Sequence, residues 1–67
     1  MEPNEIWDLL VKADDLLKYA TEERRAVRSA QATELVSRAL AEAEAIGNAH
    51  LAEQARTRLR DLGGGET

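Results

Sequence analysis

The chain has 67 residues and no cysteine, and its 13 acidic side chains outnumber nine lysines and arginines, so that the net charge is −4. A chain of this length is at most one domain, and the lack of cysteine excludes disulfides and thiolate metal sites. Nucleic-acid binding needs basic side chains that neutralise phosphates, so an acidic chain predicts no nucleic-acid partner.

The composition predicts an all-α fold. Proline occurs once, at position 3, and no glycine precedes position 47. We expect a small three-helix bundle, which is an αα-hairpin preceded by an N-terminal helix. Much of the 43% hydrophobic content is alanine, and a core this small rarely contributes more than roughly 3–5 kcal/mol. We therefore expect dimerisation or a partner to complete the bundle.

The first predicted helix covers about residues 4–20. Pro3 is tolerated in the first turn because its missing N–H would have no partner there. Apolar residues recur with the spacing 3, 1, 3, 3, 1, 3, which makes one continuous stripe along the helix. Trp7 and Val11 widen this stripe on one flank. The stripe consists of Ile6, Leu9, Leu10, Ala13, Leu16, Leu17 and Ala20.

The second predicted helix covers about residues 22–46, with a break that the pattern leaves open. Thr21 followed by two glutamates is typical of an N-cap with first-turn acids. The segment 22–29 has Val27 as its only large apolar residue, so it could be a turn or an exposed helical extension. We favour a break within 20–31, because an unbroken helix would be too long for a small domain.

The third predicted helix covers about residues 49–62. Gly47 is suited to the left-handed position after a helix, and Asn48 is a good N-cap for the helix that follows. Residues 1–62 then form a single helical domain. Residues 63–67 are rich in glycine, and we expect a flexible tail.

No group of residues in the sequence indicates a catalytic or metal-binding site. We therefore expect neither an enzyme nor a bound cofactor or metal. His50 is the only histidine, and a lone histidine without cysteine cannot build a standard zinc site. Asp14 and Asp15 are adjacent, so they diverge by about 100° around a helix. The two carboxylates therefore do not form a catalytic pair by themselves.

Charge is distributed unevenly. Residues 1–23 hold seven acids and two lysines, net −5, whereas residues 24–41 hold four arginines and one glutamate, net +3. Such a dipole can steer antiparallel or head-to-tail pairing. The alternative is the mixed charge that solvated helix faces ordinarily carry.

Two features predict a protein-binding surface. Trp7 is the best anchor, because tryptophan dominates interfaces where it fills a partner's pocket; the alternative is that it closes one end of the core. The arginine cluster at 24–28 could bind an acidic partner helix, or it could pair with Glu22 and Glu23 by helical spacing. The predicted interaction surface consists of Ile6, Trp7, Leu10, Leu17, Arg24, Arg25 and Arg28.

Residues 32–63 resemble a tetratricopeptide-type helical hairpin. The repeat motif A-x3-F-x2-A is matched by Ala32, Val36 and Ala39, with valine in place of phenylalanine. The segment 39–48 is similar to the exit of many bacterial repeats, and the hairpin resembles the terminal repeat of large bacterial regulators. A weaker resemblance is to microtubule-interacting-and-trafficking domains. Both resemblances imply a module that binds partner helices.

We therefore expect a non-catalytic protein-interaction module that packs helix on helix. One alternative is a homodimeric docking bundle with the first helix as its seam. Another is a small regulator that occludes a partner protein through its acidic N-terminal helix. No apolar run approaches the ~18 residues of a membrane span, and no basic segment precedes an apolar stretch as in a signal peptide. We expect a cytoplasmic protein without membrane contact.

Overall fold

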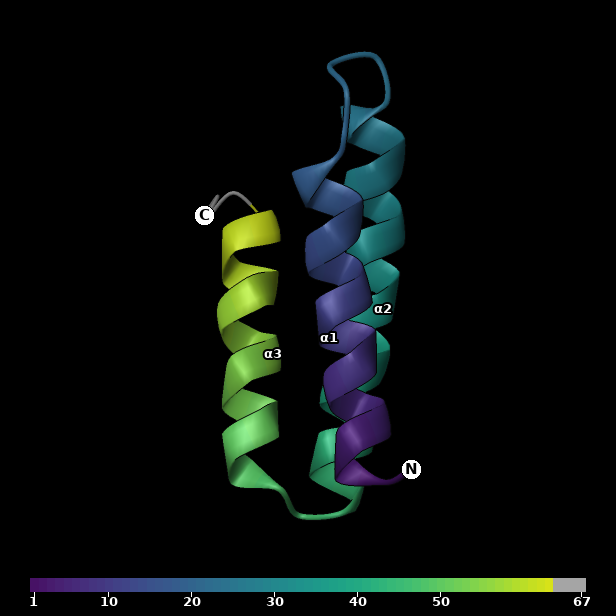
Figure 1. The fold of residues 1–67 in the computed structure, drawn as a ribbon. Coiled ribbons are helices and arrows are strands. Elements are labelled where there is room, and N and C mark those ends of the chain that lie inside the picture. Colours follow the sequence, from purple (N-terminus) through teal and green to yellow (C-terminus); the bar gives the residue numbers. More distant parts are fainter. Residues whose placement is uncertain (64–67) are drawn as a thin grey trace.

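A computed structural model describes residues 1–63, and within them the chain forms three helices (Figure 1). α1 covers Pro3–Lys18, α2 covers Arg25–Ala45 and α3 covers Ala49–Leu62. This confirms the all-α, three-helix architecture that the composition predicts. Residues 64–67, which belong to the predicted glycine-rich tail, lie outside the described residues.

The middle helix organises the fold. α1 and α3 both pack along α2 and make few contacts with each other. The Cα atoms extend over 37 × 26 × 13 Å, so the helices form a shallow layer rather than a closed cylinder. The C-terminal ends of α1 and α3 lie at the same end of this layer as the N-terminal end of α2 (Figure 1).

The core is built mainly from alanine. Only Ile6, Leu10 and Val36 are large and fully buried. Small side chains allow helices to approach closely but remove little apolar surface from water. The bundle is therefore tightly packed but has a small hydrophobic driving force. The buried residues are Ile6, Leu10, Ala13, Ala32, Val36, Ala39, Ala43, Leu51, Ala52 and Ala55.

Local hydrogen bonds fix the start of α1. Pro3 occupies the first helical position, where the lack of an N–H costs nothing. The carboxylate of Glu5 accepts a hydrogen bond from the backbone N–H of Glu2 at 2.8 Å. This bond satisfies a backbone donor and places negative charge at the positive end of the helix dipole.

The connection between α1 and α2 covers residues 19–24 and overlaps the range predicted for the break. The predicted helix start at residue 22 needs correction, because α2 begins at Arg25. The hydroxyl of Thr21 accepts from the N–H of Arg24 at 3.3 Å, and the Thr21 carbonyl accepts from the same N–H at 3.1 Å. Thr21 therefore closes a turn that precedes the helix.

The connection between α2 and α3 follows the predicted caps. Gly47 has φ = 70°, which is the left-handed region that glycine enters without steric cost. The N–H of Asn48 donates to the carbonyl of Ala43 at 2.8 Å, and that of Gly47 donates to Glu44 at 3.1 Å, as in a Schellman motif. The Asn48 side chain then accepts from the N–H of Leu51 at 3.0 Å.

We predict that Asn48→Ala lowers the free energy of unfolding by about 1 kcal/mol, because it removes the acceptor that caps α3. Urea unfolding followed by circular dichroism at the helix band measures this change. Asn48→Asp is the matched control, since it keeps an oxygen acceptor and should stay close to wild type. Equal stability of the alanine variant and wild type would contradict the cap.

We also predict that Ala39→Leu destabilises the fold by about 1–3 kcal/mol, because the added atoms overpack a close helix contact. Ala39 has no exposed surface. Ala41→Leu on the same helix is the control, because Ala41 is exposed. If both leucine variants have the same unfolding midpoint, the helices do not approach as closely as the structure shows.

Candidate interaction groove between α1 and α3

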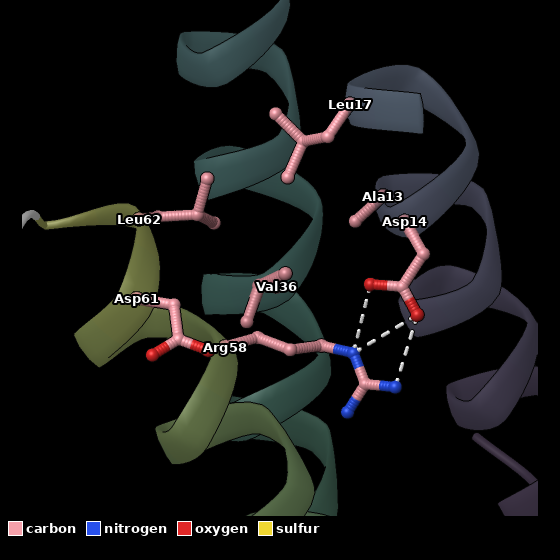
Figure 2. Close-up of a pocket in the computed structure, with 7 residues that line it drawn as sticks. All are labelled: Ala13, Asp14, Leu17, Val36, Arg58, Asp61 and Leu62. Atoms are coloured by element: carbon pink, nitrogen blue, oxygen red, sulfur yellow. Dashed lines mark hydrogen bonds and ion pairs between the residues drawn. The ribbon is translucent and has the colours of Figure 1, made fainter. Parts of the chain in front are cut away.

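A hollow of about 150 Å³ lies between α1 and α3, with α2 as its floor (Figure 2). Leu17 of α1 and Leu62 of α3 point toward each other across it, and Val36 of α2 lies beneath them. Its apolar lining consists of core side chains or their direct neighbours. The complete lining is Ala13, Asp14, Leu17, Val36, Arg58, Asp61 and Leu62.

A second hollow of about 290 Å³ continues the first toward the N-terminus of α2. The two share Leu17, Asp61 and Leu62, and the second adds Ala20, Arg25 and Ser29. We call this continuous surface the α1/α3 groove. The groove lies between the outer helices because both pack along α2 and make few contacts with each other.

In the described part of the chain, Arg58 forms the ion pair and side-chain hydrogen bonds that join α3 to α1. Its Nε lies 3.0 and 3.3 Å from the two carboxylate oxygens of Asp14, and its Nη2 lies 3.0 Å from Oδ2. Its Nη1 donates to the carbonyl and side-chain oxygens of Gln54, each at 3.1 Å. This two-pronged geometry fits a carboxylate well, so Arg58 holds α3 at a defined distance from α1.

The same guanidinium lies over the ring of Trp7, with 5.5 Å from its central carbon to the ring centroid. This distance is within the range of a cation–π contact. Trp7 remains 41% exposed, and Val11, one turn further along α1, is 38% exposed. The two therefore form an apolar rim on α1 beside Arg58.

Two predicted surface residues need correction. Ile6 and Leu10 have no exposed surface and belong to the core cluster. They lie on the side of α1 that packs against α2, so a partner cannot touch them in the folded chain. Of the predicted apolar residues, Trp7 on the rim and Leu17 in the groove remain accessible.

The predicted arginine cluster lies at the N-terminal end of α2. Arg24 and Arg25 are exposed, Arg28 is half-buried, and Arg25 lines the groove. No ion pair joins these arginines to any acid among residues 1–63. The local pairing with Glu22 and Glu23, which helical spacing allowed, is therefore not part of this structure.

Sequence reasoning missed the contribution of α3 to this surface. Arg58, Asp61 and Leu62 line the groove, but their spacing within α3 indicates only a helix with a basic C-terminal half. The signal that could identify Arg58 is its charge opposite Asp14. Those residues are 44 positions apart, so the pairing requires knowledge of how the helices pack.

The described residues offer no group of three histidine, cysteine, aspartate or glutamate side chains that could hold a metal ion. Residues 1–63 also contain no buried polar or charged side chain. His50 is exposed in the first turn of α3. Five of the ten residues that line the α1/α3 groove are apolar, namely Ala13, Leu17, Ala20, Val36 and Leu62, and the other five are polar or charged.

Comparisons with family models, with curated proteins and with solved structures find no match for this chain. The resemblance to a tetratricopeptide hairpin thus stays a prediction from the sequence. Among residues 1–63, no helix has the length and apolar character needed to cross a membrane.

We predict a modest, salt-dependent coupling between Asp14 and Arg58. Their side chains are 48% and 20% exposed, so a double-mutant cycle with Asp14→Asn and Arg58→Gln should give about 0.5–1 kcal/mol at low salt. Screening should reduce this coupling at high salt. Urea unfolding of the two single variants and the double variant measures it. A coupling of zero at low salt would mean that the ion pair does not hold α3 to α1.

Proposed function

We propose that this protein is a non-catalytic interaction module that binds an amphipathic helix in the α1/α3 groove. The observation that carries the proposal is the hollow between Leu17 of α1 and Leu62 of α3, two partly exposed leucines that face each other above the buried Val36 of α2. The partner that fits is a helix of another cytoplasmic protein or of a second copy of this chain.

Helix packing gives this groove a natural occupant. A helix laid between α1 and α3 would place its apolar ridge over the hollow above Val36 and contact Leu17 and Leu62 from either side. Recognition of an amphipathic helix in an apolar groove is a recurrent mode of binding. The bound helix would complete a four-helix arrangement around the alanine-rich core.

The energetics of the core favour the same function. Six of the ten buried residues are alanine, so folding removes little apolar surface from water. A ligand that binds only the folded state stabilises it by mass action. A partner helix would therefore add the apolar contacts that this core lacks, and folding and binding would be linked.

The rim supplies specific contacts. Trp7 is held by Arg58 at one side and remains 41% exposed, and exposed aromatic side chains of this kind commonly anchor partners. Arg58 and Asp14 are already paired, so their charges add little to the attraction of a partner. Leu17 and Leu62 would then supply the apolar contacts, and Arg25 and Asp61 are the other charged side chains that line the groove.

We predict that short amphipathic helical peptides selected from a display library against the wild-type protein lose binding to Leu17→Asp. A charge in the apolar hollow would have to be desolvated by the partner helix. Binding can be followed by the fluorescence of Trp7, the sole tryptophan, which lies on the rim.

Ala41→Asp is the matched control, because Ala41 is exposed on α2 and its change should leave peptide binding intact. Circular dichroism checks that both aspartate variants remain helical. Peptides that bind Leu17→Asp as well as wild type, or that are lost with Ala41→Asp instead, would place the binding surface elsewhere. If the wild-type protein binds no helical peptide and does not associate with a second copy of itself, the proposed function is overturned.

A further inference from the structure

We infer that the occupant of the α1/α3 groove is a second copy of this chain, packed antiparallel and face to face about a two-fold axis. The inference rests on the proposed function and names its partner. Three features carry it: the area of the grooved face, the charge difference between its two ends, and the positions of the exposed side chains along α1.

The grooved face is large enough for a stable dimer. The rectangle given by the two longer Cα extents, 37 and 26 Å, has an area of roughly 960 Å², which is comparable to the ~800 Å² that each partner buries in a standard stable interface, so a stable dimer would use most of this face. The layer is only 13 Å deep, so the face makes up a large share of the molecule. A second copy would also cover both groove hollows at once.

One end of the layer is acidic. It contains the start of α1, the end of α2 and the start of α3 (Figure 1). Arg56 and the amino terminus lie among these acids and pair with Glu44 and Glu42, which leaves the end strongly negative. Its carboxylates are Glu2, Glu5, Asp8, Glu42, Glu44 and Glu53.

The opposite end is the basic end. It contains the end of α1, the connection 19–24, the start of α2 and the end of α3 (Figure 1). Asp15, Glu22, Glu23 and Asp61 lie there too, so its excess of positive charge is small. Its cations are Lys18, Arg24, Arg25, Arg28 and Arg60.

This polarity selects one orientation of the dimer. In an antiparallel two-fold pair, the acidic end of each copy faces the basic end of the other, and symmetry repeats that contact twice. A parallel pair would bring the two acidic ends together, which is unfavourable. Arg24, Arg25 and Arg28 have no ion pair with acids among residues 1–63, and in this dimer they would meet carboxylates of the second copy.

The apolar side chains match the same orientation. Trp7 and Val11 are four residues apart, so they lie on one face of α1, in its N-terminal half. The groove hollows lie beside Leu17 and Leu62, toward the other end. Antiparallel pairing brings the exposed Trp7 of one copy opposite the groove of the other. Trp7 of each copy would then fill the groove of its partner.

Charge swapping tests this dimer directly. One variant carries Arg24→Glu and Arg25→Glu, and the other carries Glu2→Lys and Asp8→Lys. At the substituted positions, each variant alone would place like charges opposite each other in both symmetry-related contacts, whereas their mixture would again place opposite charges there. Sedimentation velocity over an about hundredfold concentration range measures the dissociation constant of each variant and of the equimolar mixture.

We expect wild type to dimerise, each variant alone to dimerise at least about tenfold more weakly, and the mixture to regain most of the wild-type affinity. The matched controls are Glu34→Lys and Arg38→Glu, two exposed positions on α2 that should not alter the dissociation constant. Acrylamide quenching of Trp7 should decrease as the dimer forms, which gives an optical readout independent of mass.

Wild type that stays monomeric at every concentration would overturn the second copy as partner, and peptide binding that depends on Leu17 would still support the proposed function. A wild-type dimer whose affinity neither variant changes would overturn the antiparallel arrangement. If either variant alone loses helicity, the mixture decides: an assembled, helical heterodimer supports the inference, and a mixture that stays unfolded overturns it.

Discussion

The close packing of α1 and α3 on the alanine-rich faces of α2 is the contact on which the rest of this structure depends. Ala32, Ala39 and Ala43 are completely buried, together with Val36. Side chains this small let two helices approach the same middle helix, but they contribute little apolar area. α1 and α3 touch each other only weakly as a result, and the space between their C-terminal halves stays open as the groove. The small side chains of α2 thus allow close helix packing and also leave the α1/α3 groove uncovered.

Arg58 joins the two outer helices that the alanine-rich core leaves largely apart. It crosses from α3 to Asp14 and lies over Trp7, and it does so at the surface, where such contacts contribute modestly. It therefore orients the outer helices without closing the apolar hollow beside them. The apolar rim of Trp7 and Val11 lies beside the Asp14–Arg58 pair, and the floor at Val36 is apolar. A partner helix would meet a preformed surface and would not have to separate the outer helices.

Local signals in the sequence accounted for the caps and the helix types, while the site required the packing. Gly47 and Asn48 could be interpreted directly, because a left-handed glycine and a capping asparagine act within a few residues. Thr21 was misleading, since its cap closes a turn and α2 starts at Arg25. The stripe on α1 gave no means of separating Ile6 and Leu10, which fill the core, from Leu17, which lines the groove. That division depends on how far α2 covers α1.

Binding of a partner helix and pairing of two copies both require that the α1/α3 groove is open in a single copy of the chain. The most direct measurement is the relaxation enhancement that a soluble gadolinium chelate causes at leucine methyl groups in dilute, monomeric protein. Leu17 and Leu62 line the groove from opposite sides, whereas Leu10 is fully buried. We expect strong enhancement at Leu17 and Leu62 and little at Leu10. Equal protection of all three leucines would show that the groove is closed and would contradict binding of a partner there.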